Sequence, residues 1–187
     1  MKVLTFAASL RQGSFNRKLI AQAVEILNGQ AGLTVDAADY REFEMPIYDG
    51  DLEEASGIPA GGKKLIGRIQ AADAVVISTP EYNGGIPGTL KNAIDWVSRN
   101  DPNPLEGKPL LLIGASPGGF GAVRGLWHTR VPFEAMGALV YPTMFGLPKA
   151  HQAFDESGKF SDPKNVGRLT ELINSYLRYA DGLKKLG

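Results

Sequence analysis

The sequence predicts an α/β fold: a doubly wound parallel sheet of five strands with helices on both faces. Two observations lead to this prediction. Short apolar runs alternate with segments whose apolar residues recur at helical spacing, and the alternation continues along all 187 residues. No repeat, low-complexity segment or linker interrupts it, so we expect residues 1–187 to form a single domain.

Five segments have the composition of strands. Continuous apolar runs are typical of strands that are buried on both faces of a parallel sheet. The run at residues 109–116 is the most hydrophobic, whereas residues 33–39 are less apolar, which favours a place near the sheet edge. In chain order, the expected strands are residues 2–9, 33–39, 73–79, 109–116 and 138–143.

Helical spacing of apolar residues follows most of these runs. Leu19, Ala23 and Leu27 show it in the first helix. Pro132 is expected to kink or divide the fourth helix. Residues 41–62 are rich in Gly, Pro and acidic residues, which predicts a long loop. The expected helices lie near residues 19–28, 60–72, 89–99, 122–136 and 163–186.

The connections between these elements predict where a ligand would bind. Right-handed crossovers between five parallel strands favour the flavodoxin-like order 2-1-3-4-5. In such a sheet, ligands bind beyond the carboxyl ends of the strands, where the strand order reverses. Three loops that break the apolar pattern, residues 9–16, 80–88 and 116–121, should meet there.

Composition excludes several classes of function. The chain has no Cys, which excludes disulfides, thiolate nucleophiles and Cys-ligated metal sites. Lys plus Arg and Asp plus Glu are equal at 20 each, without a basic cluster, so we expect no nucleic-acid partner. His128 and His151 lack metal-ligand spacing, so no metal site is expected. The N-terminus does not resemble a signal peptide and the apolar runs are too short for a bilayer, which predicts a cytoplasmic protein without a membrane partner.

The first loop has the donors of a phosphate site. Ser9, Ser14 and Asn16 can each donate a side-chain hydrogen bond, and Arg11 adds a fixed charge. The helix that follows contributes free backbone N–H groups and the positive end of its dipole. A dinucleotide site would need G-x-G-x-x-G, whereas this loop has only Gly13. We therefore predict a site for a terminal phosphomonoester.

The second and third loops have room for a flat ring. Tyr82 can cover an aromatic ligand and Asn83 can reach a polar edge, while the neighbouring glycines permit close approach to the backbone. The third loop offers Ser116 and bare glycines. Phe120 and Trp127 are expected to be packing residues instead.

Residues 114–118 match the G-x-S-x-G motif of α/β-hydrolases, and Ser116, Glu134 and His151 follow the triad order. That oxyanion hole needs the backbone N–H of the residue after the nucleophile, and Pro117 has none. A hydrolase is therefore rejected.

The three loops resemble those of the NADPH-dependent FMN reductase family, the flavodoxin-like flavin and quinone reductases. Residues 9–16, SLRQGSFN, fit the family's S-x-R-x-x-S-x-N phosphate loop. Residues 80–96, PEYNGGIPGTLKNAIDW, fit its P-E-Y-N-x-x-x-P-G-x-L-K-N-x-I-D-W block. The resemblance fades after about Gly121, and Gly85 departs from it because many members carry a serine there.

The resemblance implies FMN as cofactor, with its phosphate in the first loop and its ring along the Pro-Glu-Tyr-Asn segment. NADPH or NADH would pass a hydride to flavin N5. A quinone, flavin, azo, nitro or metal-oxyanion acceptor would then take two electrons in a ping-pong mechanism. No protein catalytic residue is expected, because the flavin carries the chemistry. The residues expected to bind FMN are Ser9, Arg11, Ser14, Phe15, Asn16, Pro80, Glu81, Tyr82, Asn83, Gly84, Ser116, Gly118 and Gly119.

Family members usually pair as dimers, often as dimers of dimers, which implies a homodimer or homotetramer here. Residues 44–51 would help to cover the partner's flavin, and the Leu90–Trp96 helix is a candidate dimer face. The resemblance leaves open the choice between NADPH and NADH, the acceptor, and whether FMN stays bound or exchanges as a substrate.

Two alternatives use other chemistry. A flavodoxin-like electron carrier would bind FMN without NAD(P)H activity, but such carriers tend to be strongly acidic, whereas this chain has zero net charge. An NAD-binding dehydrogenase would place Asp36 or Asp39 on the ribose. It would also need a G-x-G-x-x-G motif. The nearest match is residues 119–124, which have Arg124 in place of the last glycine.

Overall fold

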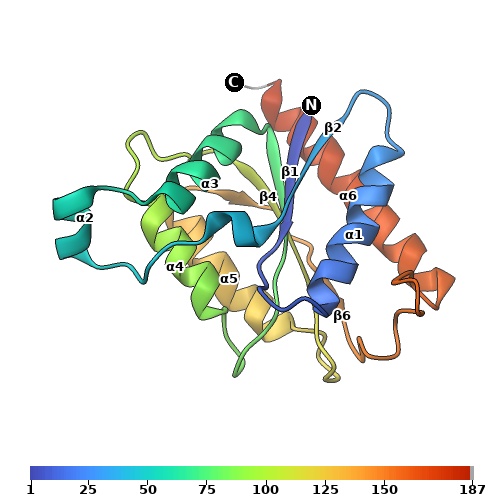
Figure 1. Ribbon diagram of the computed structural model, residues 1–187. Coiled ribbons are helices and arrows are strands. Elements are labelled where there is room, and N and C mark those ends of the chain that lie inside the picture. The colour runs from blue at the N-terminus through green and yellow to red at the C-terminus, as the bar shows by residue number, and fades with distance from the viewer. Residues whose placement is uncertain (186–187) are drawn as a thin grey trace.

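A twisted parallel sheet forms the centre of the computed structural model, which describes residues 1–185 (Figure 1). Its strand order is β2-β1-β3-β4-β5, and β6 also pairs with β4 in parallel. The predicted flavodoxin-like, doubly wound order 2-1-3-4-5 is confirmed, with one strand added. The strands are β1 (Lys2–Ala7), β2 (Thr34–Ala38), β3 (Ala74–Ser78), β4 (Pro109–Ala115), β5 (Leu139–Val140) and β6 (Phe145–Leu147).

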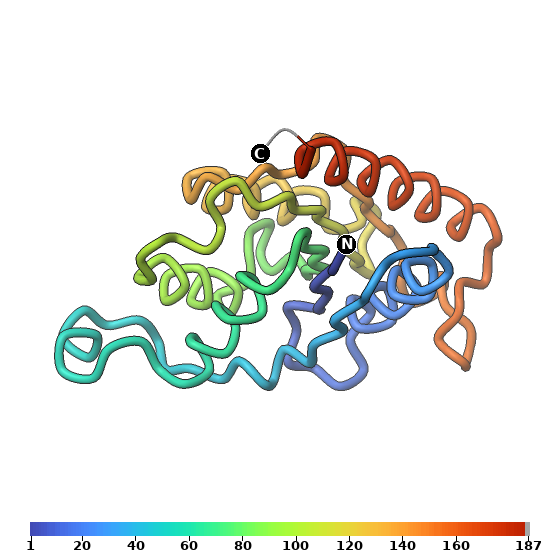
Figure 2. The backbone as a smooth tube through the Cα atoms, turned by 90° about the horizontal axis from the view of Figure 1, so that it is seen from above, coloured from blue at the N-terminus to red at the C-terminus, as the bar shows by residue number. Residues whose placement is uncertain are grey.

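Helices cover both faces of the sheet, because β1, β3 and β4 are apolar on both sides. Val3 and Leu111 belong to the core under α1 (Phe15–Asn28) and α6 (Pro163–Lys184). Leu4 and Leu112 belong to the opposite core, under α3 (Ala60–Ala71), α4 (Gly88–Val97) and α5 (Val123–Ala135). Figure 2 shows α1 and α6 side by side along one side of the molecule. Residue 186, the last of the predicted final helix, lies outside the described residues.

The expected fifth strand, residues 138–143, is wrong in extent. β5 has two residues, and Tyr141 donates the last backbone hydrogen bond of this segment to Leu110 (2.8 Å). Pro142 has no N–H to continue the ladder, so the chain leaves β4 and rejoins it at β6. The sheet consequently has a strand that the apolar pattern did not reveal.

The segment expected as one long loop, residues 41–62, contains helical structure. A 3₁₀ helix, η1, spans Tyr40–Phe43, and α2 spans Gly50–Ser56. Asp49 caps α2 by accepting a hydrogen bond from the Asp51 N–H (2.9 Å). None of the residues of α2 is buried, so it lacks the apolar stripe that would have predicted it, and it lies at the outer margin of the molecule in Figure 2.

Two expectations concern the helices. Pro132 lies inside α5 but does not divide it, because the helix continues to Ala135 without the one backbone hydrogen bond that a proline cannot donate. The α4 helix, a candidate dimer face, packs its apolar side inside the chain itself, since Leu90, Ile94 and Trp96 are at most 5% exposed. A dimer contact through its other, polar side stays a prediction. No helix among the described residues has the length and apolarity to cross a bilayer.

Candidate functional site

The loops after β1, β3 and β4 leave the sheet at the same edge (Figure 1). We call this the carboxyl edge, made of residues 8–14, 79–87 and 116–122. The strands remain hydrogen-bonded up to their exits, because Ala8 N–H donates to Ser78 O (2.8 Å) and Thr79 N–H donates to Ile113 O (2.9 Å). The predicted convergence of the three loops is present in the structure.

The first loop presents an unpaired cation beside a helix N-terminus. Arg11 is exposed, and its guanidinium makes no hydrogen bond or ion pair within residues 1–185. The Ser9 hydroxyl also has no partner among these residues, whereas Ser14 caps α1 by accepting from the Asn16 N–H (3.2 Å). Phe15, half-buried, begins the helix. The Arg11 guanidinium and the Ser9 hydroxyl are therefore not used by the described part of the protein itself.

The amide of Asn16 is committed to the protein. It donates to Ala115 O (3.0 Å) and accepts from Ala115 N–H (2.9 Å) and the Ser78 hydroxyl (2.9 Å). Asn16 is 2% exposed. This amide therefore holds strand ends together, and its expected contact with a phosphate stays a prediction.

The second loop ends in a tight two-residue turn. Tyr82 and Gly85 exchange backbone hydrogen bonds of 3.2 and 3.0 Å, and Asn83 and Gly84 between them have φ of 52° and 77°. Two positive φ values with Asn-Gly are typical of a type I′ turn. The turn projects the Tyr82 side chain, 53% exposed, outward from the edge. Pro80, which precedes the turn, is buried.

Glu81 anchors the second loop to α5. Its carboxylate accepts from Gly125 N–H (3.0 Å) and from the Arg124 guanidinium (2.5 and 2.8 Å). Burial alone would raise the pKa of Glu81, but these hydrogen bonds outweigh it and hold the pKa below its ordinary value. Sequence reasoning missed Arg124 and Gly125 as partners, because nothing in their spacing connects them to a glutamate more than 40 residues away.

The third loop folds over its own first residue. Ser116 Oγ accepts from Gly118 N–H (3.1 Å), and Gly118 O accepts from Lys149 N–H (3.1 Å). Gly119 is exposed, and a Cβ built on it would meet no atom within 4 Å. Open space therefore lies over this part of the loop, as a ligand site requires.

Two aromatic residues expected to pack inside lie on the surface. Phe120 is 69% exposed and Trp127 is 59% exposed. The Arg124 guanidinium lies 5.3 Å from the centre of the Phe120 ring, a cation–π distance. Neither aromatic residue belongs to the core of the described chain.

Backbone strain is concentrated at the carboxyl edge. Within residues 1–185, the non-glycine residues with positive φ are Asn83 (52°), Ala122 (68°) and Lys149 (48°). The first two lie in the second and third loops, and Lys149 is hydrogen-bonded to the third. Strained backbone of this kind is enriched at functional sites.

The segment after β2 closes one side of the edge. Tyr40 Oη donates to Thr89 O (2.9 Å), and the Arg41 guanidinium donates to Leu10 O. Asp39 caps η1 in a capping box with Glu42. The D-x-x-E spacing of this box was a sequence signal that could have revealed the element.

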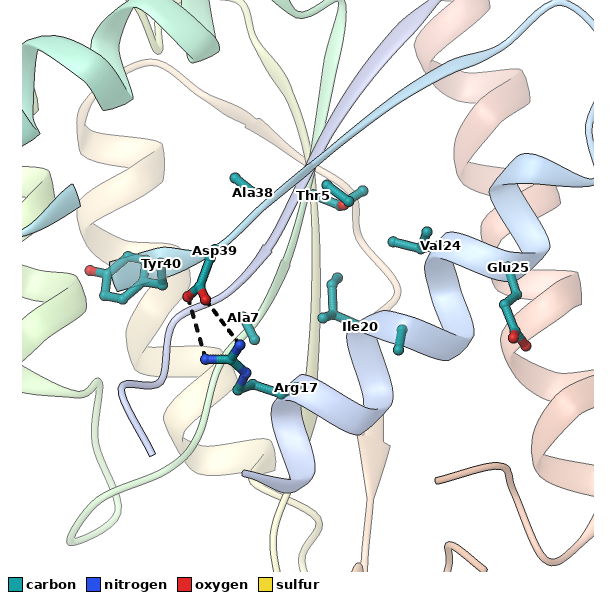
Figure 3. Close-up of a pocket in the computed structure, with 11 residues that line it drawn as sticks. Thr5, Ala7, Arg17, Ile20, Val24, Glu25, Ala38, Asp39 and Tyr40 are labelled. Carbon is teal, nitrogen blue, oxygen red and sulfur yellow. Dashed lines mark hydrogen bonds and ion pairs between the residues drawn. The ribbon is translucent and has the colours of Figure 1, made fainter. Parts of the chain in front are cut away.

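A groove of about 470 Å³ between α1 and β2 lies away from the three loops (Figure 3). Arg17 and Asp39 form a two-fold hydrogen-bonded ion pair at one end of it, with distances of 3.0 and 3.3 Å. Asp36, on β2, is paired with Arg68 (3.0 Å). Both carboxylates considered for a dehydrogenase ribose are thus already neutralised.

The structure also tests the metal and hydrolase alternatives. Among residues 1–185, no group of three His, Asp or Glu side chains is placed to hold a metal ion. Glu134, the acid of the rejected triad, is paired with Arg130 (2.5 Å).

Comparison with known proteins identifies the family. Residues 1–152 match the NADPH-dependent FMN reductase family. The chain belongs to this family. The expectation of a flavoenzyme that uses FMN and NAD(P)H is confirmed at that level, and the match extends beyond Gly121, where the sequence resemblance was expected to fade.

Individual relatives of this FMN reductase family member agree with the family assignment. The chain is 37% identical over 180 residues to an NAD(P)H-dependent FMN reductase of Pseudomonas aeruginosa, covering 95% of this chain and 92% of that protein. It is 34% identical over 186 residues to the quinone reductase of Escherichia coli K12, covering 98% and 97%. The solved structure of FerB, a flavoenzyme NAD(P)H:(acceptor) oxidoreductase of Paracoccus denitrificans, superposes with a TM-score of 0.81 at 29% identity, covering 98% and 97%.

Proposed function

We propose that this protein is an FMN-dependent NAD(P)H oxidoreductase that reduces a small-molecule acceptor by a ping-pong mechanism. The observation that supports it most is the convergence of three loops at the carboxyl edge, the first of which carries the unpaired Arg11. Quinones, flavins, azo compounds, nitro compounds and metal oxyanions are the proposed acceptors. The name of the Escherichia coli relative, quinone reductase, supports the first of these.

The residues of the carboxyl edge fit FMN. A phosphate needs several donors and a positive charge, and Arg11, Ser9 and the N-terminus of α1 supply both. The flat ring needs open space bounded by backbone, which the turn at Asn83-Gly84 and the exposed Gly119 leave free. When bound, FMN supplies the redox chemistry, by accepting a hydride from NAD(P)H and giving two electrons to the acceptor.

The chain's own residues bind and orient FMN. Arg11 binds the phosphate, Ser14 donates its hydroxyl to it, and Phe15 presents the first N–H group of α1. Tyr82 covers the ring from the second loop, where Pro80, Glu81, Asn83 and Gly84 set the backbone. Ser116, Gly118 and Gly119 close the site from the third loop, and backbone N–H groups of both loops stabilise negative charge on the reduced ring.

Assembly and location are proposed on the same basis. We propose that residues 1–187 form one FMN-binding domain, that the protein is cytoplasmic, and that it assembles as a homodimer or homotetramer. Since the apolar side of α4 is buried in the described chain, a partner would have to meet other surfaces, residues 44–51 among them.

The test is a flavin spectrum followed by steady-state kinetics. The purified protein, loaded with FMN, should oxidise NADPH or NADH with a quinone and without a helper protein. Varying donor and acceptor should give parallel double-reciprocal lines, as expected for one site used in turn. Bound FMN without NAD(P)H oxidation would support the electron carrier instead. Failure of the pure protein to bind FMN would refute the proposal.

A further inference from the structure

One buried side chain connects the three loops of the carboxyl edge. Asn16 lies in the first turn of α1, directly after the first loop. Its hydrogen-bond partners, Ser78 and Ala115, are the last residues of β3 and β4. The second loop starts one residue after Ser78, and the third starts immediately after Ala115. A single amide therefore connects the end of the first loop to the starting points of the second and third loops.

The chemistry of this contact requires an amide. Ala115 presents both a backbone donor and a backbone acceptor, so the side chain opposite must accept and donate at once. The same Asn16 oxygen also accepts from the Ser78 hydroxyl, and all three residues are at most 3% exposed. An apolar residue would leave these buried groups unpaired, and an ionised carboxylate would face the Ala115 carbonyl.

The opposite ends of the same two strands are joined in a comparable way. Tyr176 of α6 is fully buried, and its Oη lies within hydrogen-bond distance of Val75 O (2.9 Å) and Pro109 O (3.0 Å), between which it shares its one proton, and accepts from Val75 N–H (3.1 Å). These partners lie near the amino ends of β3 and β4. Tyr176 therefore holds the same strands without touching the carboxyl edge.

We propose that Asn16 is a positioning residue for FMN: its amide sets the spacing of the three loops and so prepares the flavin site before the ligand arrives. The inference rests on the proposed function. In this role Asn16 acts through Ser78 and Ala115. Tyr176 provides a matched comparison that separates positioning from general stability.

The experiment measures FMN binding and thermal stability in the apo-protein. Flavin fluorescence titration gives the dissociation constant, and thermal unfolding without ligand gives the stability. Asn16→Ala is expected to lower the melting temperature and to weaken FMN binding by about tenfold or more, since loss of a buried polar partner displaces the groups around it. Tyr176→Phe is expected to lower the melting temperature while the FMN dissociation constant stays within about twofold.

Asn16→Asp supplies a second readout if the alanine variant does not fold. A protonated carboxylic acid can donate to Ala115 O, whereas an ionised one repels it. FMN affinity of Asn16→Asp, corrected for the pH dependence of the wild type, should therefore rise as the pH falls. Unchanged FMN affinity in Asn16→Ala, equal losses of affinity in Asn16→Ala and Tyr176→Phe, or a flat pH profile in Asn16→Asp would overturn the inference. Failure of the wild type itself to bind FMN would instead refute the proposed function.

Discussion

Arg11 is an exposed cation without a carboxylate partner among residues 1–185. Arg17 is paired with Asp39, and Arg124 with Glu81, whereas Arg41 donates to the Leu10 carbonyl. Arg11 therefore differs from these three arginines because its guanidinium has neither an ion pair nor a hydrogen bond within the described chain.

Changing Arg11 to Ala should weaken FMN binding by about tenfold or more, because a charged hydrogen bond contributes about 1.5–3 kcal/mol. Riboflavin, which lacks the phosphate, should bind the variant and the wild type alike. Arg17→Ala is the matched control, since its partner is Asp39, and should leave FMN affinity unchanged. Titration of each apo-protein with both flavins measures this. Equal losses for FMN and riboflavin would contradict the phosphate assignment.

Glu81 predicts a pH-dependent contribution to stability. Because the folded-state pKa is lowered, the stabilisation is present above the ordinary glutamate value of 4.5 and is lost as the pH falls through the lower folded value. Glu81→Gln should lower the free energy of unfolding by about 1 kcal/mol at neutral pH, a modest loss because Arg124 is exposed to solvent. Below pH 4.5 the loss should become progressively smaller. Urea unfolding of both proteins across this range measures the difference. A difference that does not vary with pH would show that charge at Glu81 contributes nothing.

At the scale of single residues, the sequence indicated which side chains of the first loop can donate hydrogen bonds, but not which atoms accept them. Arg11 and Asn16 were both predicted as phosphate donors. The Arg11 guanidinium has no partner among residues 1–185, whereas the Asn16 amide is hydrogen-bonded to the ends of β3 and β4. The hydrogen bonds of Asn16 depend on the packing of α1 against β4, and the spacing of residues along the chain does not indicate this packing.

At the scale of elements, the second loop depends on its turn conformation. Asn83 and Gly84 both take positive φ, which fixes the direction in which Tyr82 leaves the edge. Strand-like and helix-like patterns predicted where this loop starts and ends. They did not predict β6 or α2, because three residues of strand and one exposed helix carry too little apolar periodicity.

Gly84→Ala should destabilise the protein by about 1–2 kcal/mol, the cost of placing a side chain in the left-handed region. A Cβ there would meet no atom within 4 Å, so the cost is conformational and not steric crowding by neighbours. Gly88→Ala, at the start of α4, also adds a Cβ in open space but without positive φ, and should change stability by less than about 0.5 kcal/mol. Chemical denaturation of the two variants side by side measures this. Equal effects would contradict the turn argument.

At the scale of the whole molecule, the sheet order was predictable because buried parallel strands are long apolar runs, and their crossover rule leaves few topologies. The position of the site followed from that order. What could not be predicted were the contacts between distant segments, such as Glu81 with Gly125 and Tyr176 with Val75. These contacts depend on how helices and loops pack across the sheet, whereas the strand order depends on the pattern of apolar residues along the chain.

The left-handed residues of the carboxyl edge have a consequence for mutational tolerance. In most positions, a change to glycine loosens a chain and lowers its stability. At Asn83, Ala122 and Lys149 the same change removes a steric penalty that the native residue carries. A search for a more heat-resistant variant would therefore find stabilising changes in or beside the loops that we propose to bind FMN, where a gain in stability is most easily offset by a loss of activity.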